Sequence, residues 1–482
     1  MDSLKDKTVK GVGWTALDSV ANYGISFLVS LVLARLLSPD EYGLIGIITI
    51  FIVVFNTIIE SGFSTALIRK PSVTNDDYST VFIINLGISI VLAVLLYFGA
   101  EGIANYFGRD ELISLTQAMS CIVIINALGI VQKAKLTKQL DFKSQTKVSL
   151  IASTASGVLG IAAAILGLGV WALVVQQISR QLLNTILLWV YSRWIPQLRV
   201  SWDSFKELFG FSWKLLVAQI INTVWTKLYQ FVIGKYYSSE TLGYYTRAEQ
   251  FGNIFSSNIT TIVQRVSLPV MSEIQNDTKR LVTAYRRIIK STMLITLVLM
   301  LGLAAVAKPM IFVLIGEKWL PCVPYLQILC FYLAFYPLHA LNLNMLQVQG
   351  RSDILLILQI IKNIIALIPI ALGIWVGIYW MLIGSVVTGF FDYFVNSYYS
   401  GKKLGYSSWS QLRDIVPSFT IAIVMAVPVW GLTLIPLSLY IVFPLQLIVG
   451  AVIILSLCEK LKQQEYIDLK NTALLYWDKI KR

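Results

Sequence analysis

The chain has 482 residues, of which 56% are hydrophobic and only 13% are charged, and its formal net charge is +13. An ordinary soluble domain carries about 25% charged residues, so this composition excludes a soluble globular protein and indicates an integral membrane protein. The basic residues lie mostly in loops on one predicted side of the membrane, so their excess does not indicate nucleic-acid binding. The four cysteines show no CxxC or Cys/His spacing, so neither a disulfide framework nor a zinc site is predicted.

Apolar segments of about 20 residues predict an all-α membrane protein with 14 transmembrane helices. The segments lie near 12–36, 43–66, 79–100, 112–132, 147–168, 170–192, 208–233, 245–268, 287–309, 322–346, 353–374, 378–399, 415–435 and 439–459. Those near 12–36, 112–132 and 245–268 are the least hydrophobic.

Basic residues gather in alternate loops and at both ends of the chain. The opposite loops carry only Arg35, Arg109, Lys235, Lys308 and Lys318. Because short loops rich in Lys and Arg stay in the cytoplasm, both termini are expected to be cytoplasmic. The last stretch, 461–482, is expected to be a cytoplasmic tail, either a basic amphipathic helix on the membrane surface or a solvated segment.

An internal repeat appears at an offset of 200 residues. Residues 35–43 (RLLSPDEYG) match residues 235–243 (KYYSSETLG) in a basic residue, a serine, an acid and a glycine. A weaker match links 136–139 (LTKQ) with 346–349 (LQVQ). Two six-helix lobes are therefore predicted, and an even number of spans relates them by a pseudo-twofold axis along the membrane normal. The expected divisions are 1–200 and 201–405 for the N-terminal and C-terminal lobes, 406–460 for two additional C-terminal helices, and 461–482 for the tail.

The two predicted helices within 211–268 are too polar to face lipid on all sides. On an ideal helix their polar residues fall on one side of each. These residues are Gln219, Asn222, Thr223, Thr226 and Gln230 in the first helix, with Lys227 at the edge, and Glu249, Asn253, Ser257, Thr260 and Gln264 in the second. Two such faces predict a water-filled cavity inside a helix bundle. The alternative is that these side chains hydrogen-bond between packed helices.

Residues 33–43 (LARLLSPDEYG), 242–251 (LGYYTRAEQF) and 138–143 (KQLDFK) resemble signatures of the Wzx-type polysaccharide flippases. These flippases belong to the multidrug/oligosaccharidyl-lipid/polysaccharide exporter (MOP) superfamily. The resemblance implies a bacterial inner-membrane flippase that moves an undecaprenyl-pyrophosphate-linked oligosaccharide from the cytoplasmic to the periplasmic leaflet by alternating access. It implies O-antigen, capsule or exopolysaccharide units as cargo. Peptidoglycan-precursor flippases share the fold, but Asp18 stands where they have a basic residue in the first span.

Basic residues within predicted spans are candidates for substrate binding, because a charge in the membrane is costly unless it faces water or a partner. Arg180 has Gln176 and Asn184 one helical turn away on either side, and Lys362 lies beside Asn363. With Lys227, they would give a cavity a positive interior that suits a pyrophosphate. The full predicted binding set is Arg180, Lys362, Lys227, Arg247, Arg265, Asn222, Asn253 and Gln176. Arg247 and Arg265 would lie at opposite ends of one helix, at the mouths of the cavity or as anchors of the helix ends. The alternative for each cation is a buried ion pair.

Acidic residues within predicted spans are candidates for ion coupling. A carboxylate in a partly dry cavity has a raised proton affinity and can also bind Na⁺ with nearby hydroxyls. The candidates are Asp392, Glu60, Asp18 and Glu249. The alternative is that each one neutralises a basic neighbour. His339, the single histidine, is expected to be a packing residue, and no metal or other cofactor is predicted.

The sequence therefore predicts a flippase rather than an enzyme, with lipid-linked oligosaccharide as substrate and H⁺ or Na⁺ as the coupling ion. A polysaccharide polymerase and other assembly proteins would be its partners, beside the membrane lipid. One alternative is a drug or organic-ion antiporter of the same fold, which a basic cavity disfavours. The other is a membrane polymerase or ligase, which usually needs a large external loop, whereas every external loop here is short.

Overall fold

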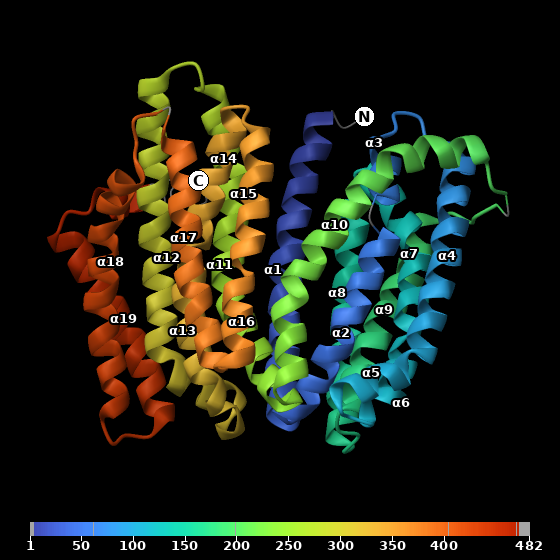
Figure 1. The fold of residues 1–482 in the computed structure, drawn as a ribbon, viewed down its shortest axis with the longest axis horizontal. Coiled ribbons are helices and arrows are strands. Elements are labelled where there is room, and N and C mark those ends of the chain that lie inside the picture. Colours follow the sequence, from blue (N-terminus) through green and yellow to red (C-terminus); the bar gives the residue numbers. More distant parts are fainter. Residues whose placement is uncertain (1–3, 61, 198, 403, 469, 472–482) are drawn as a thin grey trace. The chain divides into compact units, whose positions relative to one another are not determined.

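The computed structural model describes residues 4–60, 62–197, 199–402, 404–468 and 470–471. This part of the chain is helical and contains no strand (Figure 1). Its packing divides it into two compact units, Met1–Gly243 and Tyr244–Arg482. Most of the predicted tail, 472–482, lies outside the described residues.

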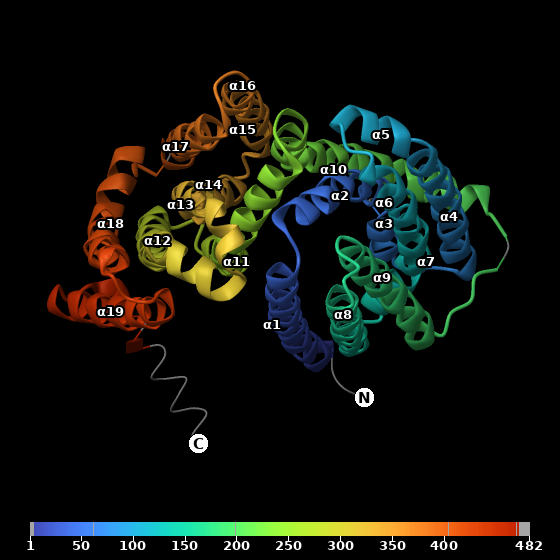
Figure 2. The ribbon, with the colours of Figure 1, turned by 90° about the horizontal axis from the view of Figure 1, so that it is seen from below.

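The first unit is built around α8 and α7. Helix α8 packs between α1 and α9, and α7 packs against α9, α4 and α2 (Figure 2). The helices are α1 (Leu4–Leu36), α2 (Pro39–Glu60), α3 (Phe63–Arg69), α4 (Asn75–Phe98), α5 (Ala100–Phe107), α6 (Glu111–Met119), α7 (Cys121–Lys138), α8 (Phe142–Ile165), α9 (Trp171–Ser192) and α10 (Trp202–Tyr236).

The second unit is built around α12 and α17. Helix α12 packs against α13, α18 and α19, and α17 packs against α13, α14 and α16 (Figure 2). The elements are α11 (Ser239–Glu273), which starts at the end of the first unit, α12 (Thr278–Ile315), η1 (Glu317–Cys322), α13 (Val323–Ala334), α14 (Tyr336–Val348), α15 (Ser352–Ile365), α16 (Leu367–Trp375), α17 (Ile378–Lys402), α18 (Ser408–Gly431), η2 (Leu432–Leu434) and α19 (Leu439–Lys460).

Each of the fourteen predicted spans coincides with a helix or with two helices in sequence. Ten stretches are long and apolar enough to cross a membrane, and α10 adds an eleventh if its two parts, bent by 50° after Gly210, count as one span. Among the described residues, α9 and α11 do not reach this hydropathy, and α1 contributes the shorter apolar stretch Val20–Leu36. The chain is therefore a multi-pass membrane protein, whereas fourteen spans stay a prediction.

The repeat found in the sequence has local counterparts in the backbone. Helices α1 and α10 end at Leu36 and Tyr236, and α2 and α11 begin at Pro39 and Ser239, so both junctions keep the offset of 200 residues. At the weaker match, Leu140 and Gly350 both have positive φ angles, 58° and 69°. The backbone around each of these two residues forms the same pattern of hydrogen bonds at the end of a helix. The repeated segments therefore share local conformation.

The division between the units falls later than the predicted lobe boundary at residue 200. Helix α10, expected to open the C-terminal lobe, packs against α2, α3 and α4 in the first unit. The lobes themselves stay a prediction, because each unit is defined here by its own packing alone.

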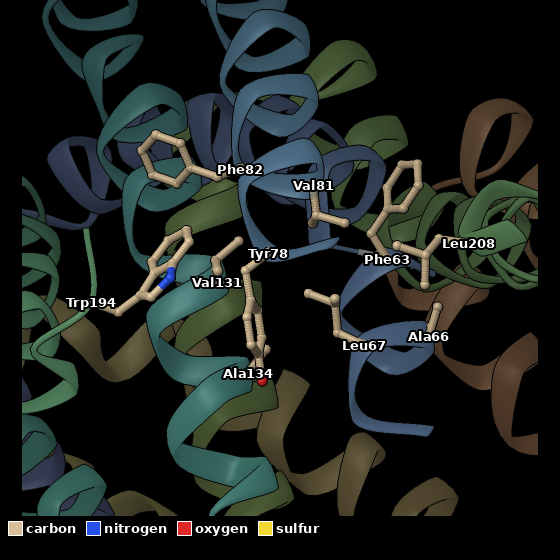
Figure 3. Packing of buried hydrophobic residues seen from close by; sticks show 10 residues of the cluster. All are labelled: Phe63, Ala66, Leu67, Tyr78, Val81, Phe82, Val131, Ala134, Trp194 and Leu208. Atoms are coloured by element: carbon tan, nitrogen blue, oxygen red, sulfur yellow. The ribbon is translucent and has the colours of Figure 1, made fainter. Parts of the chain in front are cut away.

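An aromatic cluster fixes the position of the short helix α3. Phe63 and Leu67 of α3 pack with Tyr78 and Phe82 of α4, with Trp194 beyond α9 among their neighbours (Figure 3). Nearby, the Lys138 ammonium donates to the backbone carbonyls of Leu67 and Lys70. These contacts hold α3 in place, and α3 carries part of the cavity described next.

Candidate functional site

A cavity of about 440 Å³ lies inside the first unit, among α2, α3, α7, α9 and α10. Its lining is mostly polar, although these helices are predominantly apolar. The polar lining residues are Thr57, Glu60, Ser64, Thr65, Asn126, Lys133, Thr137, Gln181, Asn184 and Gln219. We call this space the amide cavity, after Asn126, Gln181, Asn184 and Gln219. Its volume lies in the range of small-molecule sites, about 300–1,000 Å³.

Asn126 of α7 organises one wall of the amide cavity. Its Nδ2 donates to Glu60 Oε1 at 2.8 Å and to Asn56 Oδ1 at 3.1 Å. Its Oδ1 accepts a hydrogen bond from Gln181 Nε2 at 2.9 Å. One amide thus ties α2, α7 and α9 together and orients a carboxylate. Asn126 is a cavity residue that sequence reasoning missed, because a single amide in an apolar segment forms no stripe.

The polar face of α10 has both of the roles that the sequence left open. Gln219 lines the amide cavity, as the cavity interpretation predicts. Thr223, one turn further along, is buried and hydrogen-bonded to Thr57 of α2 at 3.1 Å, as the packing interpretation predicts. On α11, Ser256, which is not one of the predicted polar-face residues, donates its hydroxyl to the Leu333 carbonyl at 2.8 Å.

A second polar group lies in the second unit and consists of Lys362 (α15), Asp392 and Asn396 (α17), and His339 (α14). We call it the charged cluster. Lys362 and Asp392 attract each other electrostatically without a direct ion pair among the described residues. In the part of the chain that the structure describes, Asp392 Oδ1 and Asn396 Oδ1 are buried and accept no hydrogen bond. Asn396 Nδ2 lies 3.5 Å from His339 Nδ1. The structure thus brings together two predicted residues, Lys362 and Asp392.

The other predicted cations have different surroundings. Arg180 is exposed and has no hydrogen-bond or ion-pair partner in the described chain, and Arg265 is exposed on α11. Lys227 donates to Gln230 Oε1 at 3.1 Å on its own helix. Arg247 is only 3% exposed, and its guanidinium lies over the Trp319 ring, 5.1 Å from the centroid. In this structure Arg247 is therefore a packing residue and not an accessible cavity cation.

The remaining predicted residues are also placed by their contacts. Asp18 accepts hydrogen bonds from Asn22 Nδ2 at 2.8 Å and from the Ser149 hydroxyl, so it links α1 to α8. Gln176 faces α8, because its side chain would meet a Cβ at Gly160. Asn222 is exposed and Asn253 is half-buried. Neither Asp18 nor Gln176 lines the amide cavity.

The repeated junctions meet each other at the far end of α2 from the amide cavity. A Cβ at Gly43 would overlap the backbone of Ser239, and a Cβ at Gly243 would overlap the backbone of Pro39. Since these positions differ by 200 residues, the contact is reciprocal, as in a twofold interface. Ser38 and Ser238 each accept a hydrogen bond from the backbone amide three residues on, at Glu41 and Thr241, so both helices begin with the same N-cap.

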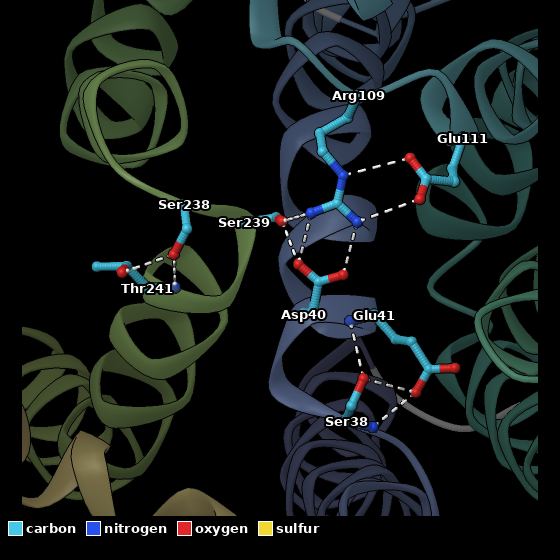
Figure 4. A network of polar contacts seen from close by, with 8 residues as sticks. All are labelled: Ser38, Asp40, Glu41, Arg109, Glu111, Ser238, Ser239 and Thr241. Carbon is cyan, nitrogen blue, oxygen red and sulfur yellow. Dashed lines mark hydrogen bonds and ion pairs between the residues drawn. The ribbon is translucent and has the colours of Figure 1, made fainter.

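Arg109 fastens this junction from the turn between α5 and α6 (Figure 4). Its guanidinium donates to both carboxylate oxygens of Asp40, at 2.8 and 2.7 Å, and to the Ser239 hydroxyl at 2.5 Å. It also forms an ion pair with Glu111 at 3.2 Å. The hydrogen bonds to Asp40 and then to Glu111 raise the pKa of Arg109 above its usual value. The charged side chains at the start of α2 thus hold neighbouring segments together.

No group of three or more His, Cys, Asp or Glu side chains that could hold a metal ion occurs among the described residues. The four cysteines are free thiols. His339 lies in the charged cluster, so it is a potential hydrogen-bonding residue there in addition to its role in packing.

Comparisons with known proteins identify the family. A model described as "Polysaccharide biosynthesis protein" matches residues 32–324. The succinoglycan biosynthesis transport protein ExoT of Rhizobium meliloti is 27% identical over 68% of this chain and 66% of its own length. The lipid II flippase MurJ in an inward closed conformation has a similar fold, with a TM-score of 0.73 and 17% identity over 94% of this chain and 100% of that chain. An inward-facing multidrug resistance MATE transporter of the MOP superfamily gives a TM-score of 0.62 at 15% identity, over 80% and 98% of the two chains. The chain belongs to the family of polysaccharide biosynthesis proteins whose model it matches over more than half its length.

Proposed function

We propose that this protein is a flippase that moves an undecaprenyl-pyrophosphate-linked oligosaccharide from the cytoplasmic to the periplasmic leaflet of the bacterial inner membrane. The observation that carries the proposal is the amide cavity, a polar space of about 440 Å³ inside a bundle of apolar helices. A transport protein needs such a space to take a hydrophilic headgroup out of water. The family, and a relative described as a transport protein, support transport over polymerisation or ligation.

The proposed architecture has fourteen transmembrane helices, two six-helix lobes and cytoplasmic termini. The matching helix ends at an offset of 200 residues and the reciprocal contact of Gly43 and Gly243 support a twofold relation of the lobes. Alternating access would then expose the substrate path first to the cytoplasm and next to the periplasm. The polyprenyl tail would remain in the bilayer while the headgroup crosses.

The charged cluster is the proposed coupling element. Asp392 has a buried oxygen without a hydrogen bond in the described chain, and Lys362 is its nearby cation. Binding of a proton or Na⁺ at Asp392 would change the electrostatic potential at Lys362. Binding of a pyrophosphate at Lys362 would likewise change the electrostatic potential at Asp392. Such mutual dependence links two ligands through a shared free energy. Arg180, which is exposed, is the proposed further contact for the anionic headgroup.

The test is the leaflet distribution of lipid-linked oligosaccharide in cells depleted of the protein. Depletion should leave the lipid-linked units on the cytoplasmic side, and the wild-type protein should clear them. Arg180→Ala should clear them at least about tenfold more slowly, because a charge-assisted hydrogen bond contributes about 1.5–3 kcal/mol. The matched control is Arg413→Ala at an exposed position of α18, which should clear them at the wild-type rate. If depletion leaves no cytoplasmic pool, the flippase proposal is wrong.

A further inference from the structure

The amide cavity has few of the properties of a pyrophosphate site. Its charged lining residues are Lys133 and Glu60, which have opposite signs. Sites for phosphate groups gather several cations, often arginines that donate two parallel hydrogen bonds. Here a carboxylate faces the same space, and it would repel a phosphate oxygen. A ligand without net charge therefore fits this lining better than an anion does.

The lining also offers hydrogen-bonding groups that the protein leaves unused. In the described chain, the side chains of Asn184 and Gln219 make no hydrogen bond. Gln181 donates one N–H to Asn126, and its oxygen accepts no hydrogen bond in that part of the molecule. An amide has two donor hydrogens and an acceptor oxygen. A sugar hydroxyl both donates and accepts, so neighbouring hydroxyls match this combination.

The unused side-chain amides of Asn184 and Gln219 lie beside a cavity wall that is already ordered by hydrogen bonds. Asn126 fixes Glu60 through one carboxylate oxygen, at 2.8 Å, and leaves the other oxygen for a further donor. Ile68, Ile130 and Leu188 supply apolar surface beside these groups, which suits the C–H face of a sugar ring. An arrangement held in place before binding loses less entropy when the ligand arrives.

We infer that the amide cavity is the subsite for the uncharged sugar portion of the lipid-linked saccharide. Asn184, Gln219 and Glu60 hydrogen-bond the sugar hydroxyls, and Asn126 is a positioning residue. The pyrophosphate is held outside this cavity by other cations. This inference rests on the proposed function, which it deepens by separating the binding of the sugar from the binding of the phosphate.

The experiment measures the binding of defined lipids to the full-length protein purified in detergent. The probes are undecaprenyl pyrophosphate alone and the same lipid linked to glucose, galactose or N-acetylglucosamine. The variants are Gln219→Ala and Asn184→Ala/Gln219→Ala. Gln219 is exposed, so its substitution does not disturb packing. Asn105→Ala, an exposed amide on α5 outside the cavity lining, is the matched control.

The wild-type protein should bind at least one sugar-linked lipid about tenfold more tightly than the bare lipid, the value of one or two added hydrogen bonds. Both variants should lose this preference and keep the wild-type affinity for the bare lipid, and Asn105→Ala should keep both affinities. An equal loss for both kinds of lipid, or no preference for any of the three sugars, overturns the inference while lipid binding still supports the flippase. Failure to bind any of the four lipids overturns the proposed function as well.

Discussion

The amide cavity and the charged cluster both place polar groups among apolar helices, but they differ in whether those groups form hydrogen bonds. In the amide cavity, Asn126 makes three hydrogen bonds between 2.8 and 3.1 Å, and the opposite charges of Glu60 and Lys133 share the lining. In the charged cluster, Asp392 and Lys362 interact without a direct contact, and buried oxygens lack partners in the described chain. The Asn126 network is rigid and holds a cavity wall in place beside the unused amides of Asn184 and Gln219, whereas the charged cluster has no such network around its charges in the described chain. The first therefore suits recognition and the second suits a change of charge.

The largest expected effect comes from breaking the charge pair of the charged cluster. Lys362→Gln or Asp392→Asn alone should lower transport by about tenfold or more, since an uncompensated charge within the membrane costs about 2.5–3.5 kcal/mol. The double variant, Lys362→Gln/Asp392→Asn, should regain the thermal stability that the single variants lose. Transport should stay low in the double variant, because the proposed coupling group is gone.

Melting temperature and leaflet-resolved transport are both needed for this test. If the double variant recovers transport together with stability, the pair is a structural contact and the cluster has no coupling role. Full activity of either single variant would remove the cluster from the mechanism altogether.

Asn126→Ala tests whether the hydrogen bonds of Asn126 order the wall of the amide cavity. It removes three hydrogen bonds at once and leaves Glu60 without its amide donor. We expect the free energy of unfolding to fall by about 1–3 kcal/mol and transport to fall severalfold. Thermal unfolding of the purified protein, with Asn105→Ala as the control, measures the first quantity. An unchanged melting temperature would mean that the network does not order the cavity wall.

Glu60→Gln separates charge from hydrogen bonding in the amide cavity. Glutamine keeps an acceptor oxygen for Asn126, so we expect transport to remain within about threefold of wild type, the value of less than one neutral hydrogen bond. The comparison variant is Glu60→Ala, which removes the acceptor and should lose more. If Glu60→Gln abolishes transport, then the carboxylate charge is essential, and Glu60 returns to its predicted role in ion coupling.

Lys133→Gln should have the smallest effect, and it matches Lys362→Gln in the other region. Lys133 is exposed at the cavity edge and forms no ion pair among the described residues. An exposed charge contributes about 0–1 kcal/mol, so transport should change by less than about fivefold. The ratio of the transport rates of Lys133→Gln and Lys362→Gln measures how much more the charged cluster depends on charge than the amide cavity does. Equal effects would show that the two regions do not differ in their dependence on charge.

Sequence patterns predicted the helices and the repeat because both depend on local chemistry. Apolar segments of spanning length coincide with helices, and the serines at 38 and 238 act as N-caps at equivalent junctions. The family match confirms that the chain belongs to a family of polysaccharide biosynthesis proteins, and two solved structures share its fold. These features can be inferred from one stretch of chain at a time.

The amide cavity could not be predicted in the same way, because it collects side chains from α2, α3, α7, α9 and α10. Periodicity assigns a residue to a face of its helix but does not show which neighbour covers that face. Arg247 illustrates this limit, since only the fold reveals that Trp319 lies over it. Gln219 was identified through its stripe, whereas Asn126 had no polar neighbour at helical spacing to mark it.

The reciprocal contact of Gly43 and Gly243 has an evolutionary consequence. Each repeat presents a glycine to the other's backbone. A larger side chain at either glycine is therefore harmful unless the facing backbone moves away. The two repeats therefore cannot diverge independently at these positions. Among aligned relatives, small side chains should therefore be retained at both 43 and 243, because each faces backbone atoms that no substitution removes. Positions a few residues away, free of this mutual constraint, should have drifted apart.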